Sequence, residues 1–142
     1  MCIPHIRLLF GVRIKSGTQK TTTKTPGDSV DTLKYYFALL FPTRYYTEGV
    51  PGTIIDAYAA GLPVIASKWE SFNDVIDQDV TGYGYRFADV EELTDLLTRI
   101  AKDPEMVTSL KKNCIDKAKY YLPKNSIENI KKMIEEKAVR GA

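Results

Sequence analysis

Two carboxylates frame the stretch of this chain whose residue types are best suited to chemistry. Residues 48 to 67 read EGVPGTIIDAYAAGLPVIAS, so Glu48 precedes a Gly-Val-Pro-Gly turn and Asp56 follows it among small side chains. If residues 51–60 form a helix, Asp56 lies about 7 Å along its axis from the first turn, on the side opposite Ile54 and Tyr58. The free amides and the positive dipole end of that turn would attract a phosphate. Carboxylates on both sides of a phosphate site predict a ligand with hydroxyls at both ends and phosphates between them, as in a nucleotide sugar.

Each of these features also has a purely structural interpretation. Glu48 could stabilise only the helix dipole, Asp56 could simply face solvent, and Gly-Val-Pro-Gly could be no more than a tight turn. Any one of them alone would favour that interpretation. Their combination directly after a buried strand favours a binding site, because ligands of open α/β sheets lie at the carboxyl ends of the strands.

The apolar runs and turn residues predict an alternation of strands and helices around that site. Short apolar runs at 38–43 and 62–67 are typical of strands buried on both faces, and 81–87 is expected to be a third strand. Helices at 51–60 and 71–77 would connect them. This order predicts a parallel sheet with helices packed on it.

Further elements are expected at both ends of the chain. Residues 3–14 predict a strand, which is followed by a polar, Lys/Thr-rich loop and a helix capped by Asp28 or Ser29 that ends near Phe37. Toward the C-terminus, Asp89 is expected to cap a helix. A second helix would follow Asp103-Pro104, with Val107, Leu110, Cys114, Ala118 and Tyr121 on one face, and a third would be capped by Ser126.

Composition limits the classes of function. The chain has 142 residues, enough for one domain, and its 44% hydrophobic and 27% charged residues are those of an ordinary globular domain. The formal net charge of +2 gives no support for a nucleic-acid partner. Cys2 and Cys114 form neither a disulfide framework nor a zinc motif, so we expect a reducing cytoplasm and no metal. His5 is the single histidine, and no apolar run is long enough to span a bilayer.

The segment YYTEGVPGTIIDAYAAGLPVIAS, with NDVI and TGYGYRF after it, resembles the nucleotide-sugar half of the GT-B glycosyltransferases in the large retaining family 4. The motif of that family is a Glu, seven further residues and a second acid, normally Glu, followed by an Ala-, Gly- and Pro-containing segment. The resemblance covers roughly residues 31–122. It implies an α/β fold: the Rossmann-like parallel sheet with helices on both faces of a GT-B C-terminal domain, followed by C-terminal helices.

The resemblance also implies roles for individual residues. Glu48 matches the acid that faces the donor sugar and is the expected catalytic residue. Asp56 matches the acid that holds the ribose hydroxyls, but its side chain is one methylene shorter than the usual Glu, so a longer reach or a bridging water would be needed. The residues expected to meet the donor sugar and the diphosphate are Gly49, Val50, Pro51, Gly52 and Thr53.

Neither a cofactor nor a metal is implied by the resemblance. Helix dipoles and basic side chains would neutralise the diphosphate leaving group, so Glu48 and Asp56 are not expected to be an acid/base pair. The implied partners are a nucleoside-diphosphate sugar and an acceptor glycan or glycolipid, with at most peripheral membrane contact.

The chain departs from the family in its length and at its N-terminus. The acceptor-binding domain has no counterpart, and neither has the strand that supplies an Arg and a Lys to the diphosphate, so the chain resembles an N-terminally truncated enzyme. We expect residues 1–30 to form an atypical strand and polar loop, in which Arg7, Arg13 and Lys15 are the nearby basic candidates. Residues 31–142 would be a partial donor-binding domain. Because half a cleft does not position donor and acceptor together, the isolated chain is expected to lack activity.

Two functions from different classes therefore stay open. One is the nucleotide-sugar-binding half of a retaining glycosyltransferase that transfers a hexosyl group to a polysaccharide or glycolipid. The other is a non-catalytic binding or assembly module that kept the fold. The apolar stripe of the last helix predicts self-association or docking of a missing N-terminal half. A dinucleotide-binding domain is the weakest alternative, because no G-x-G-x-x-G follows a strand.

Overall fold

A computed structural model of the chain describes residues 8–10 and 26–140. Within them, four parallel strands form one sheet in the order β1-β2-β3-β4. Leu39 pairs with Val64 across β2 and β3, and Val64 pairs with Gly82 across β3 and β4. The strands are β1 (Leu8–Phe10), β2 (Ala38–Phe41), β3 (Val64–Ser67) and β4 (Gly82–Tyr85). The predicted parallel α/β sheet is therefore confirmed.

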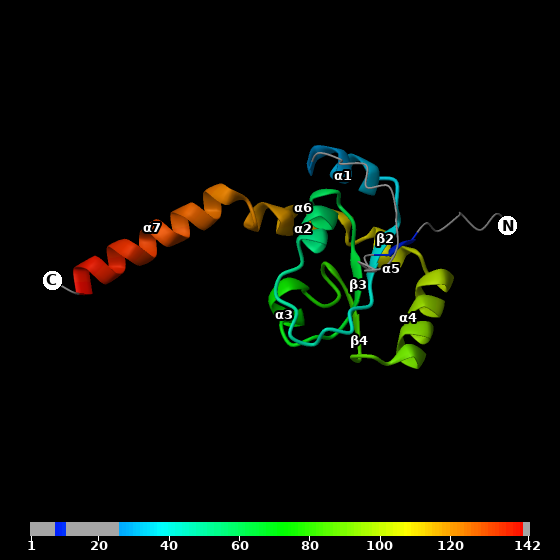
Figure 1. Cartoon of the computed structure of the whole chain (residues 1–142). Helices are drawn as coiled ribbons and strands as arrows, with labels where there is room; N and C mark the ends of the chain where they lie inside the picture. The colour runs from blue at the N-terminus through cyan, green and yellow to red at the C-terminus, as the bar shows by residue number, and fades with distance from the viewer. Residues whose placement is uncertain (1–7, 11–25, 141–142) are drawn as a thin grey trace, which may run out of the picture.

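Helices connect successive strands and continue the chain after β4. In Figure 1 the sheet lies between α2 and α3 on one side and α4 on the other, and α7 projects away from the body. The helices between strands are α1 (Pro26–Leu33), α2 (Gly52–Ala59) and α3 (Phe72–Val75). Those after β4 are α4 (Val90–Lys102), α5 (Glu105–Thr108), α6 (Lys111–Tyr120) and α7 (Pro123–Arg140).

Alternate residues of the strands build a core on each face of the sheet. On one face, Leu39, Val64 and Ala66 pack with side chains of α1, α2, α3 and α6. On the other face, Leu40 and Ile65 pack with side chains of α4 and α5. Both faces are therefore covered, which explains why β2 and β3 read as continuous apolar runs rather than as alternating ones.

The first helix, the helix after Pro104 and the last helix differ most from the prediction. The first helix begins at Pro26 and ends at Leu33, and the last begins at Pro123 rather than after Ser126. The helix expected after Pro104 is interrupted between Thr108 and Lys111, where the N–H of Leu110 donates to the Val107 carbonyl in a three-residue turn. The cap at Asp89 is confirmed, because its carboxylate accepts a hydrogen bond of 2.9 Å from the backbone N–H of Glu92.

The open side of β4 is occupied by a side chain. The Oε1 atom of Gln78 accepts a hydrogen bond of 2.9 Å from the backbone N–H of Gly84. Gln78 also forms an isolated parallel bridge with Gly82. This edge of the described sheet therefore presents fewer free backbone donors than a bare edge strand would.

The described N-terminal part belongs to the same sheet as the rest. β1 pairs with β2, and residue 30 lies within α1, so the expected division at residue 30 does not coincide with the end of an element. Most of the predicted strand at 3–14, the polar loop, and Arg7, Arg13 and Lys15 lie outside the described residues. In the part of the chain that is described, no helix is both long and apolar enough to cross a membrane.

Candidate functional site

The loop after β2 and the helix α2 that follows it carry every residue of the predicted site. Glu48 lies in the loop that leaves the carboxyl end of β2, and Asp56 lies in the middle of α2. Both side chains are partly exposed. Within residues 26–140, neither carboxylate has a hydrogen-bond or ion-pair partner. Both carboxylates are therefore free to accept hydrogen bonds from a ligand.

The start of α2 is open. Pro51 occupies the N-cap position with φ −70° and ψ 123°, and no side chain caps the helix. Gly52 and Thr53, the first two helical residues, are exposed, whereas Pro51 is buried. A Cβ placed on Gly49 or on Gly52 would meet no atom within 4 Å. The N–H groups of Gly52 and Thr53 have no hydrogen-bond acceptor among the described residues, which suits an anionic group.

The loop that carries Glu48 is fixed to its neighbours by three contacts. The Ser67 hydroxyl donates a hydrogen bond of 2.7 Å to the Thr43 carbonyl, and the N–H of Glu70 donates one of 2.9 Å to the Tyr46 carbonyl. The Tyr46 ring packs edge-on against Phe87, with 5.2 Å between the ring centroids. The ends of β3 and β4 therefore hold this loop, which limits the conformational entropy that a ligand would have to remove.

Sequence reasoning missed these anchoring contacts. Thr43 and Ser67 are hydroxyl residues placed just after β2 and at the end of β3. Because the carboxyl ends of parallel strands meet at one edge, two hydroxyl residues there are a signal for a link between loops. The signal was available, but which hydroxyl donates, and to which carbonyl, depends on the path of the loop.

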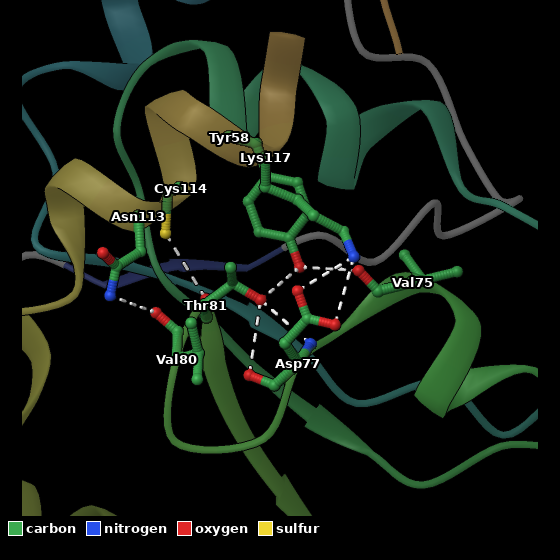
Figure 2. Close-up of polar contacts among 8 residues, drawn as sticks. All are labelled: Tyr58, Val75, Asp77, Val80, Thr81, Asn113, Cys114 and Lys117. Atoms are coloured by element: carbon green, nitrogen blue, oxygen red, sulfur yellow. Dashed lines mark hydrogen bonds and ion pairs between the residues drawn. The ribbon is translucent and has the colours of Figure 1, made fainter. Parts of the chain in front are cut away.

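The other end of α2 is held by a buried polar network, shown in Figure 2. The Tyr58 hydroxyl donates a hydrogen bond of 3.0 Å to the Val75 carbonyl and lies 3.1 Å from the Thr81 hydroxyl oxygen. Thr81 in turn accepts a hydrogen bond of 3.0 Å from the backbone N–H of Asp77. Because Tyr58 lies two residues after Asp56, this network fixes the helix that presents the candidate ribose-binding carboxylate.

Three side chains of α6 join this network. Lys117 forms an ion pair of 2.9 Å with Asp77, and the Asn113 amide donates to the Val80 carbonyl at 3.1 Å. The Cys114 thiol donates to the Thr81 carbonyl at 3.4 Å. Burial raises the pKa of Cys114 to about 12, so the thiol stays protonated at neutral pH and is a packing residue rather than a nucleophile. These contacts hold α6 against the turn before β4, and the contact between Thr81 and Tyr58 links that turn to α2.

Trp69 is a core residue and not part of the site surface. Its side chain is 3% exposed and packs edge-on against Phe41 and Phe72, with centroid distances of 5.8 and 5.5 Å. A ring this deeply buried has no exposed face on which a ligand could stack. Its indole N–H has no hydrogen-bond partner among the described residues.

A separate cavity of 330 Å³ lies between β4 and α4. Its charged lining residues are Asp79, Glu92, Asp95 and Arg99, and it includes none of the predicted site residues. No cluster of three or more His, Cys, Asp or Glu side chains in the described part of the chain could hold a metal ion. The open helix start and the two free carboxylates therefore remain the best-supported site.

The structure thus places an acid-bearing loop and helix at the carboxyl edge of a parallel sheet that helices cover on both faces. Residues 16–119 match the family described as Glycosyl transferases group 1. The chain belongs to this family. The match includes the whole β2–α2–β3 segment. It begins about 15 residues before Asp31, the position at which the sequence motifs alone had predicted the start of the resemblance.

Solved structures share the fold. Sucrose-phosphate synthase from Thermosynechococcus elongatus is 22% identical, with a TM-score of 0.60 over 78% of this chain and 27% of that one. Anabaena HepE, solved in complex with UDP, is 16% identical, with a TM-score of 0.63 over 74% of this chain and 29% of that one. The fold is that of the C-terminal half of a GT-B glycosyltransferase, and the chain spans less than a third of the length of either structure.

Proposed function

We propose that this chain binds a nucleoside-diphosphate sugar at the start of α2, as the donor-binding half of a retaining glycosyltransferase. The observation that carries the proposal is the pair of free carboxylates, Glu48 and Asp56, on either side of an uncapped helix start. Membership of the group 1 family supports it. The full reaction would transfer a hexosyl group to a polysaccharide or glycolipid acceptor in the cytoplasm.

Each part of the site has a chemical task in this proposal. The first amides of α2, at Gly52 and Thr53, would donate hydrogen bonds to the diphosphate and stabilise the charge that develops as it leaves. Glu48 would accept hydrogen bonds from the donor sugar, with Gly49, Val50 and Pro51 shaping the loop beneath it. Asp56 would accept them from the ribose hydroxyls, directly or through a water.

The isolated chain is proposed to bind the donor without turning it over. It spans 27% and 29% of the two solved structures that share its fold, so a surface for the acceptor is to be sought on a second polypeptide segment. Positioning of donor and acceptor together contributes much of the rate of a transfer reaction. Residues 31–142 would supply the donor side of that arrangement, with β1 at the edge of its sheet.

A non-catalytic assembly module is the second candidate. The observation that favours it is the row of exposed apolar residues along α7, which a binding function at α2 does not use. This alternative predicts association of the chain with no response to nucleotides. The titration below separates the two.

The decisive experiment is a calorimetric and thermal-shift titration of the chain with UDP, UDP-hexoses, GDP-mannose and ADP-glucose. One nucleotide class is expected to stabilise the folded chain, because a ligand that binds only the native state raises its stability. UDP comes first, since the HepE structure contains it. Replacing Asp56 or Glu48 by alanine should weaken binding about 10- to 100-fold, the usual cost of removing a hydrogen bond to a charged group.

Two further variants sharpen this titration. Asp56→Glu restores the usual length of the family's carboxylate and is expected to bind at least as tightly as the unaltered chain. Asp95→Ala removes an exposed helical carboxylate of α4 and should leave the affinity unchanged. If no nucleotide shifts the melting temperature, or if Asp95→Ala weakens binding as much as Asp56→Ala, the donor-site proposal is wrong.

Gly52→Ala should separate binding from stability in a single variant. A Cβ at this position meets no protein atom within 4 Å, and alanine forms helices better than glycine, so stability is expected to stay equal or rise by up to about 1 kcal/mol. The same Cβ would occupy the space through which a diphosphate approaches the first amides of α2. Affinity for the stabilising nucleotide should therefore fall about tenfold or more. Equal affinities of the variant and the unaltered chain would show that the nucleotide binds elsewhere.

A further inference from the structure

The cavity between β4 and α4 has the composition of a small-molecule site that the donor-binding function does not use. Its volume is 330 Å³. Tyr83, Tyr85 and Leu96 contribute apolar surface to it, and Gln78 adds an amide to the charged side chains named above. A concave space of this size, with apolar walls and a few polar groups, is typical of sites that take one small ligand.

Several of the lining side chains are already held in place. The Oε1 atom of Gln78 accepts a hydrogen bond of 2.9 Å from the Gly84 N–H, and its Nε2 donates one of 3.1 Å to the Asp79 carboxylate. The Tyr83 hydroxyl donates a hydrogen bond of 2.9 Å to the Met106 carbonyl, which fixes the ring. An amide, a carboxylate and a ring are therefore positioned before a ligand arrives, which lowers the entropic cost of binding.

The guanidinium of Arg99 is unpaired within residues 26–140. Asp95 lies four residues earlier on α4, a spacing at which acid and base readily pair, yet the Arg99 side chain makes neither an ion pair nor a hydrogen bond there. Burial raises the pKa of Tyr83, and the charges of Asp79 and Arg99 shift it in opposite directions. A charged hydrogen-bond acceptor and a charged donor therefore lie near the same ring.

This mixture of charges limits the chemistry of the ligand. A phosphate only accepts hydrogen bonds and would meet the carboxylates of Asp79, Glu92 and Asp95, whereas an ammonium group only donates them and would meet Arg99. A neutral hydroxyl does both, because it can donate to a carboxylate and accept from a guanidinium. A pyranose ring carries several hydroxyls around an apolar C–H face, and such a face packs well on an aromatic ring.

We propose that this cavity binds one neutral hexose unit of a glycan, with its ring against Tyr83 and its hydroxyls between Asp79 and Arg99. The site holds a glycan on the protein at a place other than the donor site. The inference is independent of the proposed donor binding, because it uses no residue of α2 or of the loop before it and needs no nucleotide.

The test is an NMR titration of the full chain, labelled with ¹⁵N, with methyl glucoside, methyl mannoside and methyl galactoside. At least one of them is expected to shift the amide signals of Gly84 and Arg99 to saturation, with a Kd of about 1 mM, the weak affinity of so small a ligand. Inorganic phosphate and spermidine are the charged probes and should leave these signals in place. The proposal is wrong if none of the hexosides saturates the signals, or if either ion shifts them as much as the hexosides do.

Asp79→Gly removes the carboxylate with little risk to folding, because Asp79 has φ +64° and glycine adopts such a conformation without strain. Hexoside affinity should fall about tenfold or more, the usual cost of losing a hydrogen bond to a charged group. Ala88→Gly is the matched control, since Ala88 also has a positive φ, 60°, but does not line the cavity. It should bind the hexoside as the unaltered chain does, and equal losses in the two variants would overturn the proposal.

Arg99→Ala should weaken hexoside binding to a similar extent. Lys102→Ala removes a positive charge from the last turn of the same helix, outside the cavity lining, and should have no effect. UDP added to the hexoside complex should leave the Gly84 and Arg99 signals unchanged. If UDP instead displaces the hexoside, the two ligands share the donor site and this proposal fails. Absence of UDP binding would refute the donor site and leave the hexoside result standing.

Discussion

Replacing Gly82 by alanine is expected to lower the free energy of unfolding by about 3 kcal/mol or more, the upper range for overpacking a tightly built site. A Cβ at this position would overlap the carbonyl oxygen of Val64 and lie 3.0 and 3.1 Å from the carbonyl carbon and the nitrogen of the same residue. These are backbone atoms of the neighbouring strand, so no side chain can rotate away. β3 and β4 would have to separate where Val64 and Gly82 pair.

Urea unfolding followed by circular dichroism measures this effect, with Gly49→Ala as the matched control. At Gly49 the same methyl group would meet no atom within 4 Å, and the backbone is not in the left-handed region. That variant should lie within about 0.5 kcal/mol of the unaltered chain. Equal stabilities of the Gly82 and Gly49 variants would mean that β3 and β4 are not paired in this register.

Replacing Tyr58 by phenylalanine is expected to cost about 2 kcal/mol, since it removes two buried hydrogen bonds and takes the donor away from the buried Val75 carbonyl. The Tyr58 side chain is fully buried, and its hydroxyl contacts both the Val75 carbonyl and the Thr81 hydroxyl (Figure 2). Burial raises the pKa of this phenol far above its usual range, so it remains a donor throughout the neutral and alkaline range. The loss should therefore be the same at pH 6 and pH 9.

Tyr35→Phe serves as the control for Tyr58→Phe, because its side chain is 79% exposed and should change stability by less than about 0.5 kcal/mol. The two variants remove the same atom, so the difference between them reports the buried network alone. A cost at Tyr58 no larger than that at Tyr35 would show that the network contributes nothing to holding α2.

The central part of the fold could be predicted because its signals are local. β2 and β3 are short apolar runs, and the helix between them has a clear start and stop signal. Pro51 lies just before α2, and Gly61, with φ +70°, lies just after it. Asp89 also met a local rule, a carboxylate that accepts the N–H three residues on. Such features depend on neighbours in sequence and need no knowledge of the tertiary structure.

The errors arose where two local signals competed for the start of a helix, or where tertiary packing determined the position of a residue. Pro26 and Pro123 each start a helix, yet the nearby hydroxyl and acidic residues were taken as caps in preference to a proline in the first turn. The stripe from Val107 to Cys114 looked continuous, whereas the hydroxyl of Ser109 donates to the Met106 carbonyl where the helix is interrupted. The burial of Trp69 beneath the site depends on Phe41 and Phe72 in other elements, so sequence spacing could not reveal it.

The hydrogen bond between Gln78 and Gly84 bears on how the chain behaves at high concentration. A strand from a second molecule that added to β4 would need the Gly84 N–H as its first donor, and the amide of Gln78 already occupies that position. Growth of a shared sheet along this side would therefore have to displace an intramolecular contact before gaining an intermolecular one. The Gln78 side chain, in the turn before β4, thus protects this edge strand against pairing with a strand of another molecule.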